Sequence, residues 1–114
     1  MTGVGAHYQV MTTVDSPTRA EAIASAVLKQ RLAACVQILG PMDSRYWWKG
    51  KLEQAEEWLC TMKTHESALD RLINLVRAEH PYETPEITAV RLESGDRDYL
   101  DWITSEVTTN RPED

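Results

Sequence analysis

A long β-hairpin centred on Lys49-Gly50 constrains the fold more than any other stretch of the chain. A two-residue loop at this point makes Trp48 face Lys51. Counting outward from this pair then assigns each residue of the first strand a partner on the second. This count puts apolar side chains on both faces of the hairpin. Because helices can cover only one face, it predicts that another copy of the chain covers the second. The alternative is a bulge at Gly40-Pro41, which would shift the count beyond it.

The same count assigns side chains to faces and places the two cysteines. One face is expected to hold Ala34, Val36 and Ile38 with Leu59, Thr61 and Lys63, and the other Cys35 and Leu39 with Trp58, Cys60 and Met62. Cys35 would then face Thr64 and Cys60 would face Leu39, so the thiols lie ~13 Å apart along the ladder. This separation exceeds the reach of a disulfide. The cysteines could share a metal ion only across chains.

Hydrophobic periodicity predicts the other elements in the order strand, helix, strand, strand, helix, strand and a final short helix. Asp15-Ser16-Pro17 supplies a cap and a first-turn proline for the first long helix, and Thr64 is expected to cap the second. The predicted strands are residues 7–14, 33–48 with a break at Gly40-Pro41, 51–63 and 86–92, and the later helices are residues 66–79 and 98–107. The last helix is expected to bury Tyr99, Trp102 and Ile103.

This order of elements predicts an α+β fold, a ferredoxin-like plait with an antiparallel sheet and both long helices on one face. The chain length of 114 residues fits one domain. We assign this domain to residues 7–107, between a flexible tail at 1–6 and a polar tail at 108–114.

A stiff polar connector, residues 80–86, joins the second long helix to the last strand. Pro81 and Pro85 fix their own backbone angles and keep the preceding residues out of the helical region. The connector carries an imidazole, a phenol and two carboxylates, and rigid polar loops between packed elements are common binding sites. The alternative is a helix stop followed by the entry to a strand.

Composition excludes several classes of function. The net charge of −6 argues against nucleic-acid binding, which needs a basic face. No stretch is long and apolar enough to span a membrane, and the first residues do not resemble a secretory signal. The two cysteines have no close spacing, which is typical of free thiols in a reducing compartment. We therefore expect a cytoplasmic protein.

Candidate ligands for a metal ion are the two cysteines and three histidines, but no CxxC or HExxH motif is present. Cys35 and His80 could supply a thiolate and an imidazole to copper or another transition metal. The alternatives are a small buried hydrophobic side chain for Cys35 and a cation at a helix C-terminus for His80. No catalytic motif is recognisable, so we do not expect an enzyme; the alternative is an uncharacterised enzyme that uses Glu83 and Glu86 as general acid and base.

A groove for a small molecule is a second possibility. Its lining could include Tyr46, Trp48, Tyr82, Glu86 and Lys63 at a boundary between subunits. Tyrosine and tryptophan suit such boundaries because one end of each side chain is apolar and the other is polar. Plain interface packing is the alternative role for the tryptophans.

Three runs of residues resemble the CutA divalent-cation tolerance family. They are residues 31–36 (RLAACV), 46–53 (YWWKGKLE) and 80–87 (HPYETPEI), and Gly95-Asp96 with residues 99–103 (YLDWI) adds to them. The resemblance covers nearly the whole chain. It implies a ferredoxin-like plait in a homotrimer, tolerance to divalent metals with copper as the favoured ion, and no established catalysed reaction. The matching positions, near the inter-subunit clefts in family terms, are Cys35, Tyr46, Trp48, Lys63, His80, Pro81, Tyr82, Pro85 and Glu86.

Two departures from the family pattern reduce the number of soft metal ligands. Some members carry a second histidine where this chain has Glu79, and some carry a cysteine where this chain has Met11 and Thr12. The resemblance therefore leads to two hypotheses. The first is a trimer associated with divalent-metal tolerance that binds an ion, with copper favoured, through Cys35 and His80. The second is a regulatory trimer that binds a small metabolite or anion near Lys63, Tyr82 and Glu86, with no organic cofactor expected in either case.

Overall fold

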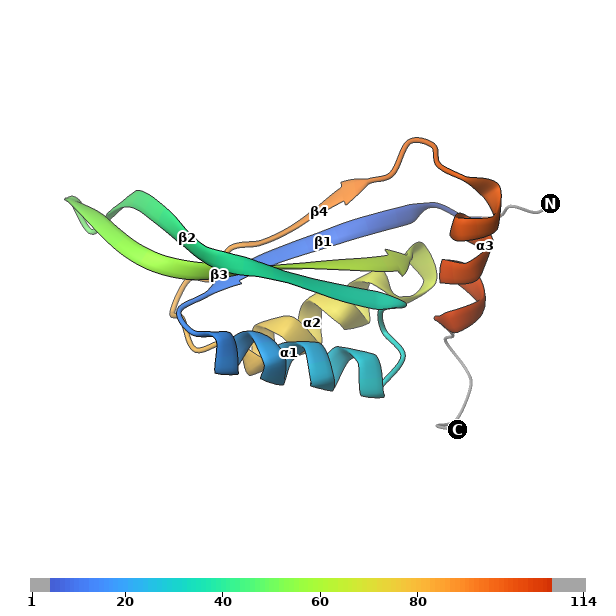
Figure 1. The fold of residues 1–114 in the computed structure, drawn as a ribbon, viewed down its shortest axis with the longest axis horizontal. Coiled ribbons are helices and arrows are strands. Elements are labelled where there is room, and N and C mark those ends of the chain that lie inside the picture. The colour runs from blue at the N-terminus through green and yellow to red at the C-terminus, as the bar shows by residue number, and fades with distance from the viewer. Residues whose placement is uncertain (1–4, 108–114) are drawn as a thin grey trace.

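The computed structural model describes residues 5–107, which form a four-stranded antiparallel sheet and three α-helices (Figure 1). In chain order the elements are β1 (His7–Val14), α1 (Pro17–Lys29), β2 (Cys35–Trp48), β3 (Lys51–His65), the 3-10 turn Glu66–Ala68, α2 (Leu69–Glu79), β4 (Ile87–Arg91) and α3 (Arg97–Glu106). The strands lie in the order β2-β3-β1-β4. The α+β class and the predicted order of elements are confirmed. The predicted tail at 108–114, and all of the tail at 1–6 except its last two residues, lie outside the described residues.

Helices α1 and α2 lie side by side against one face of the sheet (Figure 1). The core between them is apolar and includes Val10, Ile23, Met62, Leu72 and Val76. None of the helices in residues 5–107 is long and apolar enough to cross a membrane.

Helix α1 begins as the sequence predicts. The Ser16 side chain accepts a hydrogen bond of 3.1 Å from the Arg19 backbone N–H, and Pro17 occupies the first turn, where its missing N–H costs nothing. Ala20, Ile23 and Val27 recur at helical spacing and are buried against the sheet. The cap and the apolar stripe together fix where the helix starts and how it is rotated.

The predicted cap of the second long helix is wrong. Thr64 belongs to β3, is fully buried, and donates a 2.7 Å hydrogen bond to the carbonyl of Leu32. The next residue, His65, caps the 3-10 turn Glu66–Ala68, because its Nδ1 accepts from the backbone N–H of Ser67 at 3.1 Å, whereas α2 itself starts after Ala68 without a side-chain cap. A 3-10 turn then leads into α2, which buries Leu72 and Val76 completely. Because the Thr64 hydroxyl bonds to Leu32 and does not cap a helix, β3 continues to His65, beyond the predicted end at residue 63.

The pairing of the hairpin follows the predicted count only in its outer part. Trp48 faces Lys51 and Met42 faces Glu57, as expected, but the register shifts between Leu39 and Met42. Two residues of β2, Gly40 and Pro41, lie opposite the single residue Trp58 of β3. This is the β-bulge that the sequence left open as the alternative.

The bulge overturns the predicted faces of the inner hairpin. Cys35 pairs with Lys63 and Cys60 pairs with Ile38, in place of Thr64 and Leu39. The side chains that share the helix-covered face are Val36, Ile38, Cys60 and Met62, and those on the other face are Cys35, Gln37, Leu39, Leu59, Thr61 and Lys63. The second face of the inner sheet is therefore mixed, and not apolar throughout as predicted. Both cysteines are free thiols, as expected.

Gly40 is required where the bulge forms. A Cβ atom at this position would collide with the indole ring of Trp58, which packs directly over the glycine. Because the clash is with a rigid ring, the packing of Trp58 and the glycine depend on each other. The position of the bulge is thus set by a contact between the two strands.

Beyond the bulge, residues 42–57 form a two-stranded ribbon that we call the arm. It projects past the ends of the other strands and the helices (Figure 1), so the chain measures 50 × 29 × 22 Å. Strand β1 pairs with β3 only as far as Trp58 and leaves the arm without a third strand. Large apolar side chains are exposed on it and at its base: Trp47 is 72% exposed, Leu39 70% and Leu52 64%. Much of the uncovered apolar surface therefore lies on the arm and at its base.

Helix α3 lies across the end of the sheet that is opposite the arm (Figure 1). Ile103 is buried, as predicted, but Tyr99 and Trp102 are 40% and 41% exposed, so their predicted burial within the chain is wrong. Arg31 holds the end of α3 through a 3.0 Å ion pair with Glu106. The two aromatic rings stack on each other and leave one side of the pair open to solvent.

Candidate functional site

The connector between α2 and β4 is fixed to β1 by the imidazole of His80. Its Nε2 lies 2.9 Å from the carbonyl oxygen of Thr13, and its Nδ1 lies 3.2 Å from the backbone nitrogen of Tyr82. A carbonyl can only accept and an amide N–H can only donate, so the ring carries its proton on Nε2. Both ring nitrogens are therefore engaged within the chain.

The protonation state of His80 follows from the same contacts. Burial lowers the pKa of His80 below its ordinary value, against weaker opposing effects from the Thr13 carbonyl and the nearby Asp15 and Glu57 carboxylates. A second proton on Nδ1 would also point at the Tyr82 N–H. The neutral ring is the form that this site holds, and a metal ion could reach either nitrogen only by displacing one of its partners.

Tyr82 joins the connector to the arm. Its hydroxyl donates a 2.7 Å hydrogen bond to Oε2 of Glu57, a side chain that is only 6% exposed. Burial, followed by the contact with Glu57, raises the pKa of Tyr82, so the phenol keeps its proton and remains the donor. Sequence reasoning missed Glu57. The signal was available, because the count that is correct in the arm already places Glu57 opposite Met42.

A cavity of about 580 Å³ lies between the arm and the connector, and a second of about 340 Å³ adjoins it. The first is lined by Tyr46, Trp47, Trp48, Tyr82, Glu83 and Thr84, and the second by Thr13, Ser44, Arg45, Tyr46, Glu57, Thr84 and Glu86. Tyr46 and Thr84 belong to both, so we call the two together the arm cavity. It brings together four predicted site residues, Tyr46, Trp48, Tyr82 and Glu86.

Lys63 and Cys35 lie elsewhere in the chain. They face each other across β2 and β3, and the Lys63 ammonium donates to Oε1 of Gln37 at 3.1 Å. Lys63 also pairs with Gln9, whereas His80 contacts Thr13, four residues along β1, which is ~13 Å. Cys35 and His80 of one chain therefore do not meet, and residues 5–107 contain no group of three or more potential metal ligands.

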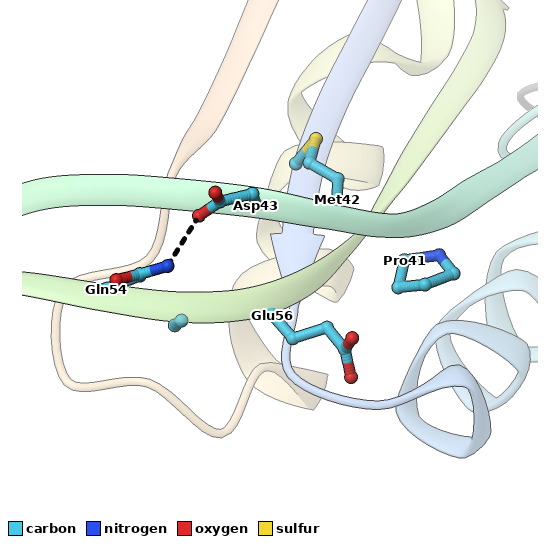
Figure 2. A pocket seen from close by; sticks show the side chains of 6 residues that line it. Pro41, Met42, Asp43, Gln54 and Glu56 are labelled. Carbon is cyan, nitrogen blue, oxygen red and sulfur yellow. Dashed lines mark hydrogen bonds between the residues drawn. The ribbon is translucent and has the colours of Figure 1, made fainter.

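A further cavity, of about 490 Å³, lies along the bulge (Figure 2). Two of its polar side chains are engaged within the arm, since Asp43 accepts from Gln54 across the two strands and holds Arg45 at 2.9 Å, while Glu56 also lines it. Unlike the arm cavity, this cavity contains no aromatic side chain and none of the predicted site residues. The arm cavity is the better candidate site.

The comparisons agree with the resemblance seen in the sequence. A family model described as CutA1 divalent ion tolerance protein matches residues 8–106. The divalent-cation tolerance protein CutA of Thermus thermophilus is 43% identical over 94 residues, which are 82% of this chain and 91% of that protein. The chloroplastic protein CutA 1 of rice is 38% identical over 94 residues, again 82% of this chain, but this chain spans only 53% of its length.

Solved structures give the same result. The divalent cation tolerance protein (Cut A1) from Thermus thermophilus superposes with a TM-score of 0.86 at 39% identity, covering 90% of this chain and 99% of that one. The periplasmic divalent cation tolerance protein CutA from Archaeoglobus fulgidus has the same TM-score, identity and coverage. CutA1 from Oryza sativa superposes with a TM-score of 0.88 at 34% identity, over 93% of this chain and 97% of that one.

Proposed function

Because the chain belongs to the CutA1 divalent ion tolerance family, we propose that it acts as a homotrimeric divalent-cation tolerance protein of the ferredoxin-like plait class. Three copies associate through their arms and meet a metal ion, preferably copper, at the clefts between them. The protein binds the ion and catalyses no reaction. The observation that carries this proposal is the uncovered apolar surface of the arm.

Exposed apolar side chains on the arm favour association. Trp47 and Leu52 on the arm and Leu39 at its base are largely exposed, so a monomer would leave them in water. Patches of this kind on a folded domain commonly mark contacts with another protein. Identical copies are the simplest partner, since each copy brings both an arm and an open sheet face.

The metal role assigns a thiolate from Cys35 and an imidazole from His80. Cys35 is partly exposed on the open face of the sheet, where a soft ion such as copper can approach it. Since Cys35 and His80 of one chain lie apart, the proposal requires Cys35 of one copy to lie against the connector of the next. It also requires His80 to give up one of its two hydrogen bonds when the ion binds.

The proposal is tested by sedimentation together with copper titration. At micromolar concentration the wild type is expected to sediment as a trimer, and Trp47→Asp/Leu52→Asp as a monomer with an unchanged far-ultraviolet spectrum. Cys35→Ala and His80→Ala are each expected to weaken Cu(II) binding, whereas Cys60→Ala, which removes a buried thiol, is not. If the wild type sediments as a monomer, the proposed trimer is wrong. If neither Cys35→Ala nor His80→Ala weakens Cu(II) binding, the proposed metal site is wrong.

A second candidate function is a regulatory trimer that binds a small metabolite or anion. The aromatic lining of the arm cavity favours it, because Tyr46, Trp48 and Tyr82 offer contact area to an organic molecule and no soft donor to a metal. Lys63 would reach the cavity only from a neighbouring copy. A metabolite should raise the melting temperature in buffer freed of metals, in proportion to the logarithm of its concentration once the site is filled.

We also propose that the protein works in the cytoplasm. Two free cysteines, one of them partly exposed, suit a reducing compartment. Fractionation of cells that produce the full chain tests this location, and recovery with a periplasmic marker would overturn it.

A further inference from the structure

The side chains that line the arm cavity favour a ligand of one particular charge. Its aromatic side chains, Tyr46, Trp48 and Tyr82, come from the arm and the connector. The face of an aromatic ring carries partial negative charge and attracts cations that lie within about 6 Å of its centre. These walls therefore favour a ligand that combines an alkyl part with a positive group.

The charged groups around the cavity have the same preference. Glu57, Glu83 and Glu86 line it, and Glu57 is almost completely buried. Oε2 of Glu57 accepts from Tyr82, and Oε1 has no hydrogen-bond partner within residues 5–107. Arg45 also lines the cavity, but Asp43 holds its guanidinium at 2.9 Å. The cavity is left with an excess of negative charge.

An ammonium group of the chain itself already occupies the rim. The Lys49 Nζ lies 5.5 Å from the centre of the Trp48 ring and 3.9 Å from Oε1 of Glu83. Both charged side chains of this ion pair are largely exposed, so the contact adds little to stability. It does show that an alkylammonium group fits between the indole and the carboxylate.

From these three observations we propose that the arm cavity binds a small organic ammonium ion, with its alkyl part against Tyr46 and Trp48 and its positive group directed to the carboxylates. In this site Lys49 is a competitor that partly fills the place of the ligand. The inference rests on the second candidate function, since it uses the same arm cavity. It replaces the metabolite or anion considered above with a cation.

The test uses n-butylammonium, which reproduces the lysine side chain, with the neutral 1-butanol and the anionic butyrate as controls. Each is titrated at constant ionic strength and in the presence of a chelator, while the indole N–H resonances are followed by NMR. The Trp48 resonance is expected to shift saturably with n-butylammonium only. Trp102, on α3 at the other end of the molecule, is the internal control and should not move.

Two variants test the charge argument. Glu57→Gln keeps an acceptor for Tyr82 and removes the buried negative charge, so it should weaken n-butylammonium binding about tenfold. The matched control is Glu56→Gln, because Glu56 is the exposed neighbour on the opposite face of β3. This control should bind within about twofold of the wild type, since an exposed charge on the far face is screened by water and salt.

Lys49→Asn gives the sharpest result. Lys49 and Gly50 both have positive φ, 51° and 82°, and Asn-Gly is a favoured pair for such a turn, so the arm should keep its shape. Removing the competing ammonium should strengthen n-butylammonium binding several-fold. If the ligand were an anion, the same substitution would weaken binding.

Several outcomes would overturn the inference. They are equal shifts with 1-butanol, weaker n-butylammonium binding by Lys49→Asn, and a change in sedimentation on adding n-butylammonium. The last would mean that a neighbouring copy fills the cavity. Because the titration is done without free metal, its failure leaves copper binding at Cys35 and His80 untouched. Failure of the copper titration equally leaves this result standing.

Discussion

The two halves of strand β3 run through very different surroundings. In the body of the molecule its alternate residues Cys60 and Met62 are fully buried under α1 and α2, whereas in the arm the same alternation leaves Leu52 largely exposed. Both halves have the same strand pattern, so pattern alone does not decide burial. The difference shows which part of the chain is stable by itself and which part depends on something outside it.

The body should account for most of the stability of a single chain. Leu72→Ala removes a fully buried side chain from the core of the body and is expected to lower the free energy of unfolding by about 2–5 kcal/mol. Guanidinium denaturation measures this loss. The matched control is Leu28→Ala on the exposed side of α1, expected to cost well under half as much. Equal losses at the two positions would contradict this account of the body.

The junction of body and arm should be the next most sensitive place. Gly40→Ala brings a Cβ against the Trp58 ring and is expected to lower the free energy of unfolding by about 1–3 kcal/mol. Gly95→Ala, where a Cβ would make ordinary contacts with Leu100, is the control. In a Trp58→Leu background the same glycine substitution should cost less, because the ring that it meets is gone. An equal cost in both backgrounds would mean that the clash is not its cause.

The link from connector to arm should give the third largest loss of stability. Tyr82→Phe removes the donor to the buried Glu57 and is expected to cost about 1–2 kcal/mol in the same denaturation experiment. Tyr99→Phe, which removes only a 3.8 Å contact with the Cys35 sulfur, should cost much less. A Tyr82→Phe variant as stable as the wild type would show that the connector does not help to hold the arm.

The link from connector to body should show the smallest effect, and only in acid. Because the folded chain lowers the pKa of His80 below its ordinary value of 6.5, the unfolded chain binds more protons just below that pH. The contribution of neutral His80 is therefore complete above about pH 6.5 and is lost as the pH falls through the lowered pKa. Denaturation of the wild type and of His80→Asn at pH 7.5 and pH 5 should give a difference in stability that shrinks in acid.

Asn at this position keeps an acceptor for the Tyr82 N–H but does not titrate. The comparison therefore separates the effect of protonating His80 from the loss of this hydrogen bond. His65→Asn serves as the control, since it leaves His80 in place and should retain this part of the pH dependence. A difference between the wild type and His80→Asn that is constant with pH would contradict the lowered pKa of His80.

Local signals in the sequence were sufficient for most of the body. Ser16 and Pro17 start α1, the alternation of residues 7–14 gives β1, and Lys49-Gly50 places the turn of the arm. Each signal lies within a few residues of the feature that it predicts. The class of the fold followed from the order of these elements.

The remaining features depend on contacts between distant parts of the chain. Gly40-Pro41 indicated an irregularity, but the one-residue shift depends on Trp58 packing over Gly40. Thr64 is a residue type that commonly caps helices, but its hydroxyl donates to the carbonyl of Leu32, 32 residues away in the chain, and the residue stays in β3. The contacts that form the candidate site span 67 residues for His80 with Thr13 and 25 for Tyr82 with Glu57. Four residues of the cavity were predicted from their chemistry, but their arrangement was not.

The bulge sets the direction of the arm without affecting which residues pair within the arm. If Pro41 were deleted, Leu39 would still face Leu59, Gly40 would face Trp58, and Met42 would still face Glu57, so every pairing further out would survive. What would change is the bend and twist that the extra residue imposes. A lineage of such chains can therefore re-aim its arm by gaining or losing a single codon, while the side chains at the tip remain as they are.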